Sequence, residues 1–389
     1  MGPVPPPADG GIAAYLDGLL RSDLARRYEL TTFDVRPRRF FRRHRGLRPL
    51  LTVKFVLGYT LRLASSRPDL VHIHASDNAS LWEKSLLAGL ARMLRRPYLL
   101  HLHGNAYEPF LMALPPAGRR LAALGLRGAR RVIVLSERAR GGRLAELAGL
   151  ERLVVLPNAI HMRDFEPPGA PPPGGASAEA PLPGSGLRLI FVGNLCSDKG
   201  VDDLLQALSE VVRSGSTNFQ VDLVGDELES GERARYLRLA EQTGLAPRLH
   251  FLGTVVGDRK LELLRAADLF VLPTHRESFG IANLEAMACG LPVVSTRTGA
   301  IPDYLTDGVD GLLVEPGDVP ALAAALRRLL GDGALRRRLG EAARRRVQEL
   351  DWSVAAASLA QVYEQALCGW ATPAGGRPEP PAALRAANP

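Results

Sequence analysis

The sequence has few cysteines and no long apolar runs, and both absences narrow the class of protein. Three cysteines occur among 389 residues (Cys196, Cys289 and Cys368), and their spacing matches neither a metal-ligand pattern nor a disulfide framework. This usage is typical of a reducing compartment, so we expect a cytoplasmic protein. No apolar run reaches the roughly 18 residues of a membrane-spanning helix. Residues 1–11 are proline-rich and lack the basic-then-apolar layout of a secretory signal.

Charge is unevenly distributed over a chain that is 46% apolar and long enough for two or more domains. The formal net charge is +8. Arginines crowd positions 36–48, directly before an amphipathic stretch at 50–64, which favours peripheral contact with an anionic membrane. A second arginine group, over 327–346, lies on helical patterns and is predicted to be a solvated face. No basic motif interleaved with aromatics is present, so we expect no nucleic-acid partner.

Short apolar runs alternate with helical patterns along most of the chain, which predicts an α/β protein with parallel sheets. The strand-like runs are 70–74, 98–102, 131–135, 153–156, 187–192, 220–224, 249–252, 269–272, 292–295 and 312–314. A stretch rich in Pro, Gly, Ala and Ser, residues 166–186, divides these runs and cannot build a core, so it is predicted to be a linker.

The predicted architecture is therefore two doubly wound, Rossmann-like domains that face each other across a cleft. The N-terminal domain covers residues 1–165 and the C-terminal domain residues 187–350. Residues 351–370 are expected to form a helix that packs back on the N-terminal domain, and residues 371–389 to be a disordered tail. Ligands of such sheets bind at the carboxyl ends of the strands, so the cleft is the expected site.

Two glutamates separated by seven residues are the most informative feature. Glu277 follows the strand-like run 269–272 in a loop, and Glu285 lies inside the helix that follows. The free amides at the start of that helix can hold a phosphate. A carboxylate on each side can accept hydrogen bonds from the hydroxyl groups of two sugars, one of them the ribose. The alternative is structural, with Glu277 capping the helix and Glu285 on the surface.

A second candidate segment, residues 192–200, follows the first strand of the C-terminal domain. Gly193 allows close approach of the backbone to a ligand, and Lys199 lies directly before a predicted helix. A lysine at this edge gives a diphosphate leaving group a positive partner. The alternative is a solvated loop lysine.

The N-terminal half offers weaker candidates. His101 and His103 share one face of a predicted strand, and His103 is better placed for the cleft, although a lone histidine is more often structural. Gly10 and Gly11 precede a helix and give a flexible loop with exposed amides. The sequence has no Asp-x-Asp at a strand end and no His/Cys metal cluster, so we expect no metal and stabilisation of the leaving group by Lys199 and helix amides.

In these features the chain resembles glycosyltransferase family 4, retaining enzymes with the GT-B fold, from Gly10 to about Leu367. The motif Glu277-x7-Glu285, which begins within the segment Arg276-Glu-Ser-Phe-Gly280, carries most of the resemblance. The other matching segments are Val192-Gly193…Lys199-Gly200, Leu156-Pro-Asn158, Ala267-Asp-Leu-Phe270 and Gly299…Gly308…Gly311.

The resemblance implies a role for each candidate. Glu277 would contact hydroxyls of the donor sugar, Glu285 the ribose, and Lys199 the diphosphate, while His103 would lie beside the transferred sugar. The donor-binding set it implies is Gly10, Gly11, Gly193, Asn194, Lys199, Ser278, Phe279, Gly280, Ile281 and Glu285. Retention in the family is described as front-face attack assisted by a phosphate oxygen, so Glu277 positions the sugar and is not a nucleophile.

Two departures from the family stand out. Asn194 occupies a position where many relatives have arginine, so the phosphate clamp rests on Lys199. Relatives also place a strand before the Gly-Gly loop, whereas residues 1–8 here have prolines at 3, 5, 6 and 7, which cannot donate to a ladder. We therefore expect the first strand to be missing and the native chain to begin upstream.

Residues 71–84 resemble family members that act in surface-polysaccharide or lipopolysaccharide assembly. With the arginines at 36–48, this favours a glycan or lipid-linked acceptor at the inner membrane face. Two other hypotheses stay open: a catalytically silent nucleotide-sugar-binding module, and a nucleotide-sugar epimerase on the same fold.

Overall fold

The structure is a computed structural model that describes residues 11–33, 48–76, 79–104, 107–166 and 186–368. Several sequence predictions lie outside these ranges: Gly10, the proline-rich start, the arginines at 36–45, almost all of the expected linker, and the expected disordered tail. The expected domain boundaries therefore stay predictions.

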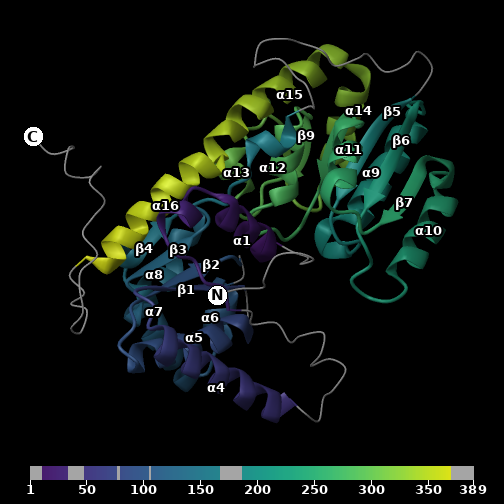
Figure 1. Cartoon of the computed structure of the whole chain (residues 1–389). Helices are drawn as coiled ribbons and strands as arrows, with labels where there is room; N and C mark the ends of the chain where they lie inside the picture. The colour runs from purple at the N-terminus through teal and green to yellow at the C-terminus, as the bar shows by residue number, and fades with distance from the viewer. Residues whose placement is uncertain (1–10, 34–47, 77–78, 105–106, 167–185, 369–389) are drawn as a thin grey trace, which may run out of the picture.

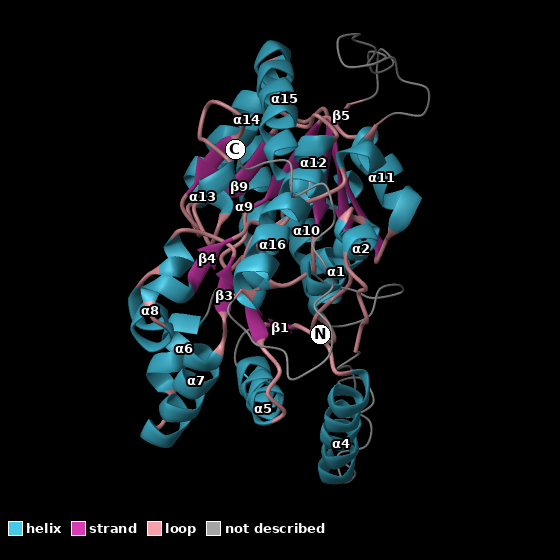
Figure 2. Ribbon diagram, turned by 60° about the vertical axis from the view of Figure 1, so that its left-hand side comes forward, coloured by secondary structure: helices cyan, strands magenta, loops and turns pink. Residues whose placement is uncertain are grey.

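All ten predicted strands are present, and they form two parallel sheets in two α/β halves (Figures 1 and 2). The last two helices follow one another along one side, the first on the C-terminal half and the second on the N-terminal half (Figure 1). The strands are β1 Val71–Ala75, β2 Tyr98–Leu102, β3 Arg131–Val134, β4 Leu153–Val155, β5 Leu187–Val192, β6 Phe219–Val224, β7 Leu249–Gly253, β8 Leu269–Leu272, β9 Val293–Thr296 and β10 Leu312–Val314.

The helices occupy the stretches between and around these strands. In the N-terminal half they are α1 Gly11–Arg21, α2 Leu24–Arg27, α4 Arg48–Ser66, α5 Ala79–Met93, α6 Tyr107–Ala113, α7 Pro116–Gly128 and α8 Gly142–Ala148. In the remainder they are α9 Val201–Arg213, α10 Glu232–Gln242, α11 Gly257–Arg265, α12 Ile281–Ala288, α13 Ile301–Tyr304, α14 Val319–Gly331, α15 Gly333–Val347 and α16 Trp352–Leu367.

The two sheets differ in strand order. The C-terminal sheet has the order β10-β9-β8-β5-β6-β7, so the chain reverses its direction of travel between β5 and β8. This is the doubly wound arrangement, and it opens a crevice beside β5 and β8 at their carboxyl ends. The described strands of the N-terminal sheet have the order β1-β2-β3-β4, with no reversal among them. The α/β class and the GT-B-like pairing of parallel sheets are confirmed.

Alternating side chains of the N-terminal sheet serve two cores. Val71, Ile73 and Ala75 of β1 pack with α4, α5 and α7 on one face. Leu99 of β2 and Ile133 of β3 face the other way, where α1, α2 and α16 cover them. Because side chains alternate along a strand, residues two apart share a face.

Helix α16 returns from the C-terminal half and packs on the N-terminal half (Figure 1). Asp351 caps it, accepting a hydrogen bond from the Ser353 amide at 2.8 Å. Trp352 is 1% exposed, and a Cβ on Gly18 of α1 would lie 1.9 Å from its Nε1 atom. The glycine therefore permits the close crossing of α1 and α16.

The prediction of a solvated face at 327–346 is only partly correct. Arg344 donates to the Ala288 carbonyl at 3.0 Å, and Arg346 donates to the Tyr304 carbonyl at 3.3 Å. The amphipathic stretch at 50–64 lies in α4, with Val53, Leu57 and Leu61 exposed. In the described ranges, no helix combines the length and apolar character needed to cross a bilayer.

Candidate active site

The two candidate loops of the C-terminal half meet where the strand order reverses. Lys199 lies in the turn after β5, and Glu277 lies in the loop after β8, the strand that pairs with β5. Their side chains form an ion pair, with Lys199 Nζ 2.7 Å from Glu277 Oε2. The exposed fractions are 25% for Lys199 and 14% for Glu277, so the pair lies at the site margin, partly open to a ligand. Lys199 is therefore not a solvated loop lysine.

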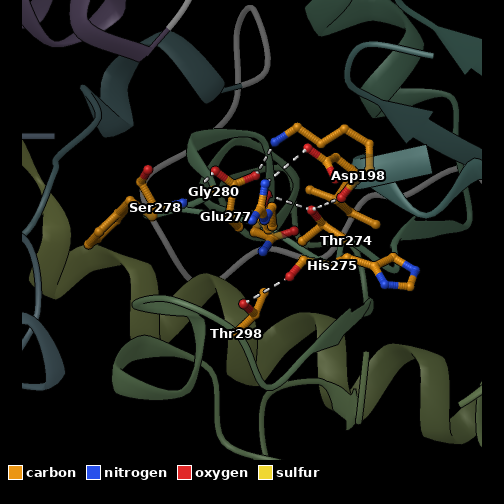
Figure 3. A network of polar contacts seen from close by, with 12 residues as sticks. Asp198, Thr274, His275, Glu277, Ser278, Gly280 and Thr298 are labelled. Atoms are coloured by element: carbon orange, nitrogen blue, oxygen red, sulfur yellow. Dashed lines mark hydrogen bonds and ion pairs between the residues drawn. The ribbon is translucent and has the colours of Figure 1, made fainter. Parts of the chain in front are cut away.

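A polar network holds the Glu277 loop against the Lys199 loop (Figure 3). The Thr274 hydroxyl donates to the Asp198 carbonyl at 3.0 Å, and the His275 amide donates to the same carbonyl at 2.9 Å. On the other side, the Thr298 hydroxyl contacts the His275 carbonyl at 3.4 Å. These contacts fix the backbone just before Glu277, and the Ala300 amide, which donates to the Ser278 carbonyl at 3.2 Å, fixes it just after, so the carboxylate is presented from a rigid support.

Helix α12 begins at a glycine that no other residue can replace without strain. Gly280 is its N-cap with φ of 87°, in the left-handed region. A Cβ there would lie 2.9 Å from the Tyr304 hydroxyl, which donates to the Phe279 carbonyl at 2.7 Å. Glu277 does not cap this helix, since its Oε1 accepts from the Ser278 amide at 3.1 Å. The first amides of α12 therefore face the site free of a side-chain cap, as an anion site requires.

The second glutamate of the motif lies on α12 and has a lysine partner of its own. Glu285 Oε1 is 2.6 Å from Lys260 Nζ of α11, and Glu285 is 13% exposed. It is thus neither a solvated surface residue nor unpaired. Each carboxylate of the motif is neutralised by a lysine from another element.

The remaining donor-site candidates lie around these pairs. Gly11 opens α1, and a Cβ on it would lie 3.9 Å from Cδ1 of Ile281, so the start of α1 approaches the start of α12 across the two halves. The Gly193 amide donates to the Val224 carbonyl at 2.9 Å, and Asn194 is exposed. Phe279 is buried against Tyr304, which leaves its amide as the group available to a ligand.

His103 lies in a cluster of four histidines under α1 and α16. Its Nε2 is 2.9 Å from Nδ1 of His74, its ring stacks on His101 with centroids 4.0 Å apart, and Tyr15 covers both rings. Burial lowers the pKa of His103 to about 3 and the pKa values of His74 and His101 well below the usual histidine value. These rings are neutral at physiological pH, so His103 offers hydrogen bonding and shape but no charge.

The histidine cluster also supplies the one grouping of metal-ligating side chains found in the described residues. Ligand atoms of His72, His74 and His101 lie within 4.8 Å of one another. Neither Glu277 nor Glu285 belongs to it. A cavity of about 380 Å³ runs along the outer edge of β1, lined among others by His72 and His74, and it too is separate from the Lys199–Glu277 pair. The absence of a metal from the donor site stays a prediction.

Two Rossmann-like halves, with a helix start free of a side-chain cap at the switch point of the second, define a GT-B-type protein. Residues 177–346 match the family model described as "Glycosyl transferases group 1", and residues 11–159 match the "Glycosyl transferase 4-like domain". The chain belongs to glycosyltransferase family 4 of the GT-B enzymes.

Two relatives with named activities are similar to this chain over most of its length. The chain is 34% identical over 278 residues to the 2-deoxystreptamine N-acetyl-D-glucosaminyltransferase of Streptomyces fradiae, covering 68% of this chain and 62% of that protein. It is 33% identical to the D-inositol 3-phosphate glycosyltransferase of Xylanimonas cellulosilytica, covering 74% of this chain and 68% of the relative. The chain therefore spans less than two thirds of the Streptomyces fradiae relative's length.

A solved structure confirms the fold. HepE of Anabaena in complex with UDP superimposes with a TM-score of 0.65 at 21% identity, covering 86% of this chain and 85% of that one.

Sequence reasoning missed three residues that shape the site. Lys260 is 25 positions from its partner and has no motif of its own. Asn283 and Tyr304 form a buried hydrogen bond of 2.9 Å beneath the start of α12. The Asn inside an apolar helix segment is the signal that could have found this pair, because a buried amide requires a partner.

Proposed function

We propose that the protein is a retaining glycosyltransferase that moves a sugar from a nucleoside diphosphate sugar to a hydroxyl acceptor, without a metal at the donor site. The observation that carries this proposal is the Lys199–Glu277 ion pair of 2.7 Å at the switch point, just before the start of α12, which no side chain caps. The fold and the family indicate a glycosyltransferase, and this ion pair indicates how the diphosphate sugar would be bound.

The pair suits a diphosphate sugar because each partner can exchange its ion-pair contact for a ligand contact. A diphosphate gives Lys199 a stronger anionic partner, and the amides at the start of α12 complete the oxyanion contacts. Glu277, released from Lys199, accepts hydrogen bonds from hydroxyl groups of the sugar. The leaving diphosphate is then stabilised where its negative charge develops, which is the main requirement of the reaction. His103, neutral and held by His74, packs on the acceptor side.

The acceptor is the less constrained half of the proposal. The named relatives act on 2-deoxystreptamine and inositol 3-phosphate, both polyhydroxylated rings, so this class belongs in the acceptor panel beside glycans and lipid-linked saccharides. The exposed Val53, Leu57 and Leu61 lie four residues apart on α4 and form an apolar stripe. Together with the arginines at 36–48 it supports a lipid-linked acceptor in a cell-surface pathway and peripheral contact with the inner membrane face.

The test is a thermal-shift panel of nucleoside diphosphate sugars, with and without EDTA, on wild type and Glu285→Ala, followed by product analysis with the acceptor panel. We expect a saturable shift for one donor family that EDTA does not change and that the variant loses. Transfer of sugar to an acceptor with retained configuration completes the proposal.

Other outcomes separate the alternatives. Donor binding without turnover on any acceptor identifies a silent module, which the exposed Asn194 in place of arginine would favour. Altered sugar products from donor alone identify an epimerase. A donor shift that EDTA abolishes overturns metal independence.

A further inference from the structure

Lys260 is a second lysine at the paired glutamates, and it comes from helix α11, outside the segments that carry the resemblance to the family. It lies on α11, and its Nζ is 2.6 Å from Glu285 Oε1. The side chains are 26% and 13% exposed, so solvent and salt screen this pair less than a surface pair. In the described part of the chain, the other carboxylate oxygen of Glu285, Oε2, accepts no protein hydrogen bond.

We propose that Lys260 is a positioning residue that holds Glu285 so that Oε2 accepts hydrogen bonds from the ribose hydroxyls of the nucleotide. This inference rests on the proposed function, because Glu285 takes its ribose role from the family. A glutamate side chain loses rotamer freedom when it is fixed by a ligand, and a carboxylate already fixed by an ion pair loses less. Lys260 therefore makes the site selective for the ribose and leaves the diphosphate contacts to Lys199.

The two lysines differ in what a ligand does to them. Lys199 exchanges Glu277 for the diphosphate, so its ion pair opens on binding. Lys260 keeps Glu285 while the ribose binds to the opposite oxygen, so its ion pair persists. Loss of Lys260 should weaken recognition of the ribose alone.

The experiment is calorimetric titration of UDP, GDP and ADP, followed by the 2′,3′-dideoxy form of the nucleotide that binds. Wild type should prefer the ribose form by about tenfold, the value of hydrogen bonds to a charged group. In Lys260→Met this preference should fall to within about twofold, through weaker binding of the ribose form only. The donor KM of Lys260→Met should rise with kcat nearly unchanged. Lys260→Arg should restore most of the ribose preference.

Arg259→Met is the matched control, since Arg259 lies on the same helix, is exposed, and pairs with Glu262 at 2.8 Å. It should keep the wild-type preference. The double variant Lys260→Met/Glu285→Gln should lose no more than Glu285→Gln alone, because the two side chains act as a unit.

Each contrary result has a distinct meaning. Equal weakening of ribose and dideoxy forms by Lys260→Met, or an unchanged preference, overturns the positioning role. A wild type that binds nucleotides with no ribose preference overturns it as well. A wild type that binds no nucleoside diphosphate overturns the proposed function itself.

Discussion

In the C-terminal half, the charged side chains of the site are 13–26% exposed and stand in two Lys–Glu pairs. In the N-terminal half, His74, His101 and His103 are 2%, 0% and 7% exposed and lie against one another beneath Tyr15. Both sets lie on parallel sheets of similar construction. A partly exposed ion pair can exchange its partner for a ligand, whereas a buried imidazole cluster resists ionisation.

The contrast divides the proposed reaction between the halves. Charge stabilisation of the leaving group falls to the C-terminal half, where Lys199 and the α12 amides meet. The N-terminal half contributes a neutral surface and the packing of α16. Substitutions in the charged pairs of the C-terminal half should therefore affect catalysis. Substitutions in the buried packing of the N-terminal half should affect stability.

The largest effect is expected for Glu277→Gln. The amide keeps the shape but cannot pair with Lys199 or accept sugar hydroxyls as a carboxylate does, so kcat should fall by about 100–1,000-fold, the usual loss for a transition-state contact. Transfer assays at saturating donor measure it. Glu262→Gln, on exposed α11 surface, is the control. A loss smaller than tenfold would remove Glu277 from the chemistry.

Next in size is Lys199→Met, which should weaken nucleoside diphosphate binding by about 10–100-fold, equivalent to roughly 1.5–3 kcal/mol. Because Asn194 replaces the usual arginine, no neighbouring cation in this loop substitutes for it. Calorimetric titration measures the loss, with exposed Lys54→Met as control. Unchanged affinity would place the diphosphate elsewhere.

A third prediction concerns the seam between the halves. Gly18→Ala places a methyl group 1.9 Å from Trp352 Nε1, and overpacking of this kind costs about 1–3 kcal/mol of unfolding free energy. Urea unfolding should show the loss while nucleotide affinity holds. Gly58→Ala on α4 meets nothing within 4 Å and should leave stability unchanged or raised. Equal effects of the two variants would contradict tight packing at this crossing.

The sequence predicts the two halves unequally well. All ten strands, the helix expected over residues 351–370 and the meeting point of Lys199 and Glu277 follow from local pattern and the switch-point rule. The histidine cluster does not, because it depends on the register between β1 and β2, which pairs His74 with His101. The sequence does not predict the contact of Lys260 with Glu285 for a similar reason, because this contact depends on how α11 packs in the core. Local patterns specify elements, while contacts between distant elements require the folded structure.

The smallest effect we expect is an acid-dependent loss of stability in the N-terminal half. Burial lowers the folded-state pKa of His103 to about 3, below its unfolded value near 6.5. Below pH 6.5 the unfolded chain therefore binds a proton that the folded chain does not, and stability falls as pH decreases, by at most about 1.4 kcal/mol per pH unit for each such histidine. Above pH 7 this contribution is constant. Urea unfolding at pH 7.5, 6.5 and 5.5 should show a steeper fall for wild type than for His103→Gln, by about 1 kcal/mol between the last two values. His250→Gln, on exposed β7 surface, should match wild type. If His103→Gln keeps the full wild-type slope, the ring is already protonated or solvated in the folded protein, and the two halves handle charge alike.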